Sequence, residues 1–344
     1  MEPNEQMPGT FPEEGQTPPP FREDEAKRSF ARVGFAVSAV ILISYLSVYL
    51  IQWAVFLFFP QIFETSLFQL ASGSLPMYLF GFGAGALILR KMPRELPERR
   101  RVKPQMYLIL FVMLFGVMYI GNLISTQLIA IIELITGQPY ISDLETVVSE
   151  SPVYLTILFS VILAPIMEEL FFRKLLIDRL TPFGDVVAIV VSAVIFGLFH
   201  GNFYQVFYAA GLGLILGWIY LYSGNILYSI SLHMLFNLAG GVLLPKLVEQ
   251  LGLGDGELTL DVLIDSIVAH PFAFLGYMAY VLFLYAALIT TVTLVIVMRR
   301  RIMDPLRAGS TPIPRGKRMS VIFCNVGICI LVLLTVGMFA LSFL

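Results

Sequence analysis

Long apolar runs alternate with short polar segments along the chain. Nine runs are long enough to cross about 30 Å of hydrocarbon at about 1.5 Å per helical residue. In a bilayer, backbone polar groups must be satisfied within the protein, so such runs are expected to be helices. The pattern predicts an all-α, polytopic transmembrane helix bundle of about eight or nine spans. The runs cover residues 33–59, 71–89, 106–135, 152–177, 186–202, 203–222, 226–246, 271–298 and 319–343.

Composition leads to the same class of protein. Of 344 residues, 58% are hydrophobic and 13% are charged, whereas soluble domains carry about 25% charged residues. Mean hydropathy is +0.83. Soluble, disordered and fibrous proteins are therefore excluded, and the lipid bilayer is the expected surroundings. The 22 basic and 24 acidic residues nearly cancel, so no net positive field favours a nucleic acid partner. The two cysteines lie in one apolar run and form neither a disulfide framework nor a metal motif.

Charges in the polar segments predict the orientation. Residues 1–28 hold six prolines and seven acids and are expected to be a disordered cytoplasmic tail. Basic residues gather at 90–103, 173–179 and 299–318, whereas the other connecting segments are neutral or acidic. Since basic loops favour the cytoplasmic side, a multi-pass protein of the cell membrane with a cytoplasmic N-terminus is expected. Nine spans would put the C-terminus on the side of the membrane opposite the cytoplasm. Between the fifth and sixth runs, Gly201–Asn202 is the available turn.

Few ionisable groups lie inside the runs. They are Glu168, Glu169 and Arg173 in the fourth run, and His200 and His233, two of only three histidines in the chain. Ionisable groups at membrane depth are costly and by default mark a functional site. The third histidine, His270, starts the eighth run and is expected to be a wet interfacial residue.

Spacing separates the two neighbouring acids. Glu168 and Glu169 point about 100° apart on a helix, so they cannot do the same job. Arg173 follows Glu169 by four residues in the favourable order for an ion pair, which predicts a pair that holds the fold. Glu168 has no such partner on its helix and is free to serve chemistry.

Two further pairs at helical spacing accompany the histidines. Phe196 precedes His200 by four residues, and its ring is expected to pack on the imidazole. His233 and Asn237 project from one side of the seventh run, where Asn237 alone could equally serve as polar glue between helices. Gly213 and Gly217 form a GxxxG pair that allows close helix approach. Three helices could thus surround one pocket, although Glu168, His233 and His200 lie at about 16, 11 and 24 Å from the basic helix ends.

These motifs resemble a known family. Glu168, Glu169 and Arg173 form the pattern EExxxR, Phe196 and His200 form FxxxH, and His233 and Asn237 form HxxxN. In this order, on three membrane helices, they resemble the CPBP intramembrane proteases, the group of CAAX prenyl endopeptidases also called Abi proteins. The resemblance covers roughly residues 150–247. It divides the chain into N-terminal transmembrane helices at 29–149, a CPBP-type catalytic core at 150–247 and C-terminal transmembrane helices at 248–344.

The resemblance implies an intramembrane peptidase, conventionally classed as a metalloendopeptidase, with its site between helices. Glu168 would activate water with help from His200, His233 and Asn237 would stabilise the oxyanion, and Glu169 and Arg173 would support the site. Substrates would be peptides or proteins, lipidated or not.

Two versions of the mechanism stay open. Glu168, His200 and His233 could bind Zn²⁺ with an open fourth position, or they could act without a metal. HExxH is absent, so the standard zincin helix is excluded. Two other functions compete with proteolysis: a proton-coupled transporter, and a non-enzymatic membrane scaffold or immunity protein.

Overall fold

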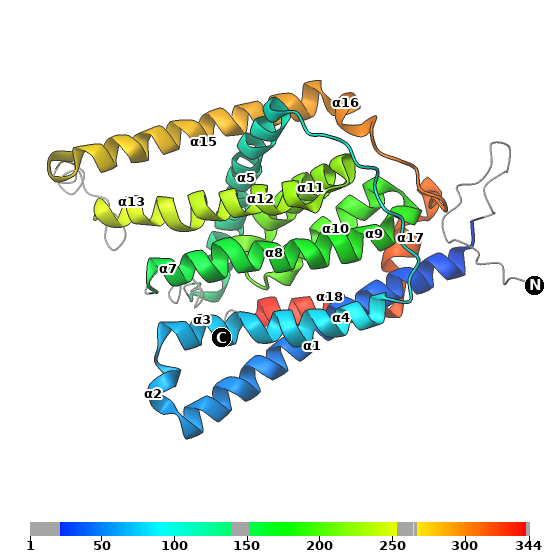
Figure 1. Ribbon diagram of the computed structural model, residues 1–344, viewed down its shortest axis with the longest axis horizontal. Helices are drawn as coiled ribbons and strands as arrows, with labels where there is room; N and C mark the ends of the chain where they lie inside the picture. Colours follow the sequence, from blue (N-terminus) through cyan, green and yellow to red (C-terminus); the bar gives the residue numbers. More distant parts are fainter. Residues whose placement is uncertain (1–20, 139, 141–150, 253–263, 265–266, 342–344) are drawn as a thin grey trace, which may run out of the picture.

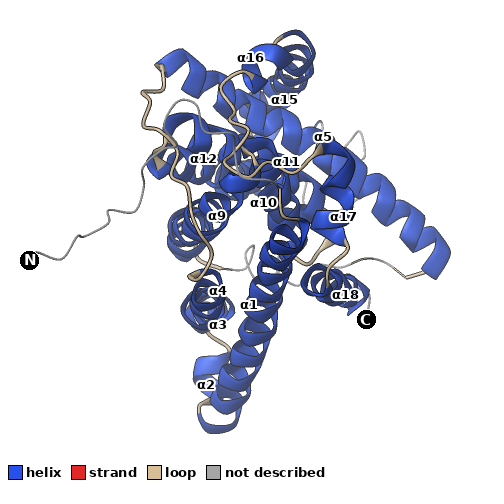
Figure 2. Cartoon of the chain, turned by 90° about the vertical axis from the view of Figure 1, so that its right-hand side faces the viewer, coloured by secondary structure: helices blue, strands red, loops and turns tan. Residues whose placement is uncertain are grey.

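A computed structural model describes residues 21–138, 140, 151–252, 264 and 267–341. The described residues contain helices and no strand, as Figure 2 shows. The all-helical, polytopic bundle predicted from the apolar runs is thereby confirmed. The N-terminal part comprises α1 (Glu23–Phe58), α2 (Pro60–Phe63), α3 (Ser66–Pro76), α4 (Phe82–Leu89) and α5 (Pro104–Thr136), with a π-helical turn at Met77–Gly81 joining α3 to α4.

The central part carries the motif residues. One long helix comprises α7 (Val153–Thr156), a π-helical segment Ile157–Leu163, α8 (Ala164–Glu169), a second π-helical segment Leu170–Ile177 and α9 (Asp178–Leu180). Then follow α10 (Asp185–Phe199), α11 (Phe203–Ser223), α12 (Ile226–Leu238), a π-helical turn Ala239–Leu243 and α13 (Leu244–Gln250). The chain continues with α15 (Pro271–Val297), α16 (Arg299–Met303), α17 (Arg318–Phe323) and α18 (Val326–Leu341).

The span count reaches the lower end of the eight or nine spans predicted, one fewer than the nine apolar runs. Seven of the described helices are long and apolar enough to cross a membrane, or eight if the pair α17 and α18, bent by 63°, forms one span. The bend has a polar cause: Asn325 Oδ1 accepts from the Ile328 backbone N–H, and its amide donates to the Ile322 carbonyl at 2.8 Å.

The fifth run also differs from the prediction. Helix α10 has 15 residues, so it is about 22 Å long and falls short of about 30 Å of hydrocarbon. Gly201, with φ of 66°, reverses the chain after α10, and the Asn202 side chain accepts from the Gln205 N–H at 2.9 Å to begin α11. The Gly201–Asn202 turn was expected, but the early end of α10 was not.

The predicted tail 1–28 was too long at its C-terminal end. Helix α1 already begins at Glu23, with three acids in its first turn, where negative charge is favoured by the helix dipole. Glu23 also lies 2.9 Å from Lys27 Nζ one turn later. Residues 1–20 of the predicted tail lie outside the described residues.

The basic segments lie together at one end of the bundle. In Figure 1, the connection from α4 to α5, the end of α9 and the turn at α16 all lie at the right-hand end, whereas α2 and the end of α13 lie at the left. Two of these segments fasten the central helices. Glu95 N–H donates to the Asp178 carbonyl and Arg100 N–H to the Ser223 carbonyl, each at 2.8 Å. Arg307 N–H donates to Asp185 Oδ2, also at 2.8 Å. Which end is cytoplasmic stays a prediction.

Close glycine contacts hold α10 against α11. A Cβ added to Gly213 would lie 2.8 Å from Ala193 Cα, and one added to Gly197 would lie 2.8 Å from Ala210 Cβ. The second glycine of the GxxxG pair, Gly217, leaves 3.2 Å to the Ile177 side chain. The hairpin that carries His200 therefore depends on the absence of side chains at its interface.

We expect Gly213→Val to destabilise the bundle by roughly 1–3 kcal/mol, because its methyl groups would force the backbones of α10 and α11 apart. Thermal unfolding of the purified protein in detergent measures the effect. The control is Gly83→Val on α4, since a Cβ there meets no atom within 4 Å. Equal unfolding temperatures of the two variants would contradict the close-contact interpretation.

Candidate active site

The predicted ion pair is present and fully buried. Arg173 Nε lies 3.0 Å from Glu169 Oε2, and neither side chain is exposed. The guanidinium also lies against the ring of Phe196, with Cζ 4.8 Å from the ring centre. A cation–π contact in a dry environment adds to the ion pair. Both charges are thus held by residues of the fold, as expected for a pair whose removal from water must be compensated.

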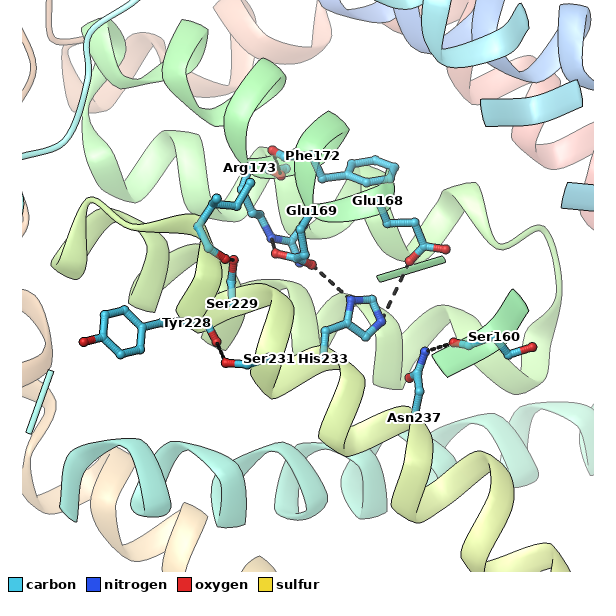
Figure 3. A network of polar contacts seen from close by, with 12 residues as sticks. Ser160, Glu168, Glu169, Phe172, Arg173, Tyr228, Ser229, Ser231, His233 and Asn237 are labelled. Atoms are coloured by element: carbon cyan, nitrogen blue, oxygen red, sulfur yellow. Dashed lines mark hydrogen bonds and ion pairs between the residues drawn. The ribbon is translucent and has the colours of Figure 1, made fainter. Parts of the chain in front are cut away.

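The same carboxylate also holds His233. Glu169 Oε1 lies 3.1 Å from His233 Nδ1. Because a carboxylate paired with arginine accepts hydrogen bonds, Nδ1 carries the proton and donates. Figure 3 shows Glu169 between Arg173 and the imidazole, with Glu168 beyond the other side of the ring. Glu169 therefore fixes the orientation of His233 and directs its Nε2 towards Glu168.

Glu168 is the acid without a firm partner. Its side chain is buried, and within the described residues its nearest charged neighbour is His233, with Oε2 3.8 Å from Nε2. This distance is too long for a hydrogen bond but short enough for strong electrostatic coupling. With Arg173 and Glu169 paired, a single proton shared between Glu168 and His233 leaves the cluster electrically neutral. A proton that passes between Glu168 and His233 therefore leaves the net charge of the cluster unchanged.

His200 is oriented by its own helix. It caps the C-terminal end of α10, and its Nδ1 lies 2.8 Å from the Phe196 carbonyl oxygen. A carbonyl can only accept, so Nδ1 donates and Nε2 keeps a lone pair. The Phe196 ring stands nearly perpendicular to both imidazoles, at 4.9 Å from His200 and 5.9 Å from His233. The predicted Phe196–His200 packing is present, and Phe196 contacts Arg173 and His233 as well.

Asn237 lies one turn beyond His233. Its Nδ2 donates to the Ser160 carbonyl at 2.9 Å. That carbonyl belongs to the π-helical segment Ile157–Leu163. An amide nitrogen carries two hydrogens, so one remains for another acceptor. The prediction left open whether Asn237 joins helices or serves the site, and one amide can do both.

A cavity of about 420 Å³ brings these groups together. Its lining includes Glu168, His200, His233 and Asn237. The different depths estimated from helix lengths therefore do not separate them. Residues outside the motif region also line this cavity. They include Tyr45 on α1, Ser74 on α3, Met77 and Tyr78 in the π-helical turn after α3, and Met338 on α18. No sequence motif marked these residues, because they are uncharged and lie in ordinary apolar runs.

The three proposed zinc ligands do not form a ligand cluster. Within the described residues, no group of three His, Cys, Asp or Glu side chains is arranged so that it could hold a metal ion. A catalytic zinc site needs three protein ligands around one point about 2 Å away. The arrangement of Glu168, His200 and His233 does not supply this set.

Comparison with known families agrees with the motif region. Residues 150–239 match the family model described as type II CAAX prenyl endopeptidase Rce1-like. This segment is therefore similar to the CAAX protease family, in agreement with the resemblance of the motifs. It contains every candidate site residue named above from Ser160 to Asn237. No curated protein and no solved structure matches the chain.

We expect Arg173→Met to destabilise the protein by roughly 3–5 kcal/mol, because it leaves the Glu169 carboxylate buried without its main counter-charge. The double variant Glu169→Gln with Arg173→Met should recover part of this loss, since no uncompensated charge remains. Thermal unfolding in detergent measures both. The control, Arg100→Met, breaks an exposed pair with Glu98, which is worth about 0–1 kcal/mol. If Arg173→Met unfolds at the same temperature as this control, the buried pair does not hold the site.

Proposed function

We propose that this protein is an intramembrane endopeptidase that hydrolyses peptide bonds with water activated by Glu168 and His200. One observation carries the proposal: a carboxylate outside the Glu169–Arg173 pair, two oriented imidazoles and an amide line a single cavity within the membrane-spanning helices. The family match of residues 150–239 supports the same class of reaction. Substrates are membrane-associated or free peptides, and lipidated and unlipidated chains both satisfy this chemistry. The protein resides in the cell membrane with its N-terminus in the cytoplasm.

The first step is attack by water. Glu168 accepts a proton from a water molecule, and the oxygen bonds to the carbonyl carbon of the peptide. His200 assists because its free Nε2 lone pair can accept a hydrogen bond from the same water. No serine or cysteine is needed as nucleophile.

The developing oxyanion needs hydrogen-bond donors. The second N–H of the Asn237 amide and the protonated Nε2 of His233 supply them, and both are held in place before substrate binds. Preorganised donors of this kind typically provide about 10²–10³ in rate each. Glu169 and Arg173 act as positioning residues, because they fix the His233 ring without touching the substrate.

The second step breaks the C–N bond. The proton on Glu168 passes to the departing amine nitrogen while the carbonyl forms again. The products are a new carboxyl terminus and a new amino terminus, and the site returns to its starting charge. The cycle therefore uses one water and needs no further reactant.

We expect Glu168→Gln, His200→Ala and His233→Ala each to lower the rate of peptide cleavage by about 10²-fold or more, because each removes a group that moves a proton or stabilises charge. Cleavage products in membranes that contain each variant are measured by mass spectrometry. Glu133→Gln on α5 is the matched control, since it makes the same change outside the cavity.

Retained cleavage by Glu168→Gln would refute the assignment of Glu168. If Glu168→Gln abolished proton-coupled transport instead, and no cleavage occurred with the natural chain, the transporter function would replace proteolysis. If Glu168→Gln left every activity intact, a scaffold or immunity role would be favoured. The same variant can retain uncut substrate in native membranes, which identifies that substrate.

We expect chelators that remove Zn²⁺ to leave peptide cleavage unchanged, because the donor set lacks three ligands around one point. Metal analysis of the purified protein and cleavage after dialysis against a chelator test this. Loss of cleavage that is restored by one equivalent of Zn²⁺ would establish the metal version.

A further inference from the structure

A second cavity of about 560 Å³ adjoins the candidate active site. It lies between α5, the beginning of α11, the end of α12 and the π-helical segment Ile157–Leu163. Four residues line both cavities: Ser160, Gln205, Tyr208 and Asn237. The two cavities therefore meet at Asn237, the residue to which the proposed mechanism gives an oxyanion contact.

The lining of the second cavity combines apolar side chains with uncharged polar ones. It includes the side chains of Asn122, Ser125 and Thr126 on α5, Thr156 and Asn202, and no charged side chain among the described residues. Polar groups on membrane-spanning helices are unfavourable unless they find hydrogen-bond partners. Packing of helices alone does not require so many hydroxyl and amide groups around a space of this size.

One hydroxyl in this lining has no hydrogen-bond partner in the part of the chain that the structure describes. The Tyr280 hydroxyl on α15 is buried and makes no hydrogen bond within the described residues. Buried polar groups are nearly always hydrogen-bonded to protein, water or ligand. The Tyr280 hydroxyl is therefore available to a molecule that enters the cavity.

We propose that the second cavity binds an uncharged, extended segment of the substrate on one side of the scissile bond. This inference rests on the proposed protease function and adds the class of peptide that the site accepts. Hydroxyl and amide groups complement the N–H and C=O groups of a peptide backbone, which recur along an extended chain. The absence of charged side chains disfavours acidic or basic residues and a free terminal carboxylate in this segment. The volume lies within the range of about 300–1,000 Å³ that is usual for ligand sites.

A glycine in the cavity wall allows a direct test. A Cβ added to Gly240 meets no atom within 4 Å, so Gly240→Leu can fill the cavity without displacing the backbone. Leucine also favours helix over glycine, which protects the fold of the variant. Gly83→Leu is the matched control, because Gly83 is also helical, has no atom within 4 Å of an added Cβ, and lines neither cavity.

The probe is a synthetic, uncharged decapeptide with a photoreactive benzophenone side chain, added to the full-length protein in lipid nanodiscs. We expect cross-links to residues that line the second cavity. Gly240→Leu should reduce their yield about tenfold, and Gly83→Leu should not change it. A peptide of the same length with lysine or glutamate throughout the segment should also bind about tenfold more weakly. Cross-links only outside the cavity, no cross-links at all, or equal yields for the two leucine variants would overturn the proposal.

A second variant keeps the test valid if Gly240→Leu fails to fold. Thr126→Val has nearly the same shape but removes one hydrogen-bonding group, and it should weaken binding of the decapeptide. Unchanged binding by folded Thr126→Val and undiminished binding by a charged peptide would together contradict backbone recognition. Reduced cleavage by Gly240→Leu with undiminished cross-linking would assign the cavity to the passage of water instead and overturn the proposal.

The same experiments distinguish failure of the peptide-binding proposal from failure of the protease proposal. If the decapeptide is cross-linked in the second cavity but never cut, the peptide site stands and proteolysis falls. If the natural chain and Gly240→Leu cut the decapeptide equally well, proteolysis stands and the second cavity is not part of the substrate site.

Discussion

The buried contacts of Glu169 are the constraint on which the rest of the site depends. One carboxylate binds Arg173 through one oxygen and His233 through the other. These contacts join the long helix of α7 to α9 with α12, and Glu169 and His233 are 64 positions apart in the sequence. Because the carboxylate fixes the tautomer of His233, it also decides which ring nitrogen faces Glu168. The contacts of this one carboxylate thus balance the charge of Arg173, orient the His233 ring and join two helices.

Irregular helix geometry around this contact places the site residues. Helix α10 ends at Phe199, and His200 directly after it lines the cavity. Two π-helical segments flank α8, the short helix that carries both acids. Such segments are rare and frequent at functional sites, since the extra residue per turn shifts which side chains face a cavity. The adjacent acids consequently have separate surroundings: Glu169 is locked in the bundle and Glu168 lines the cavity.

Sequence patterns predicted what depends on local spacing. The helical bundle, the Glu169–Arg173 pair, the packing of Phe196 on His200 and the turn at Gly201–Asn202 all follow from periodicity or turn chemistry. The contact of Glu169 with His233 could not be predicted, because it depends on how two distant helices pack. The walls from α1, α3 and α18 and the second cavity were missed for a related reason: neutral residues in apolar runs carry no periodic signal. The bend before α18 and the short α10 depend on single polar or glycine residues, so run length overestimated the number of spans.

The two neighbouring acids have opposite roles, Glu168 in catalysis and Glu169 in stability, and one paired measurement tests both. Peptide cleavage and thermal unfolding should be measured together for Glu168→Gln and Glu169→Gln in the same lipid nanodiscs. Glu168→Gln should lose cleavage by about 10²-fold or more while unfolding at the natural temperature or above, because it removes a buried charge whose contact with His233, at 3.8 Å, is too long for a hydrogen bond. Glu169→Gln should lower the unfolding temperature, because it leaves Arg173 unpaired. Cleavage by Glu168→Gln at the natural rate would contradict the central claim.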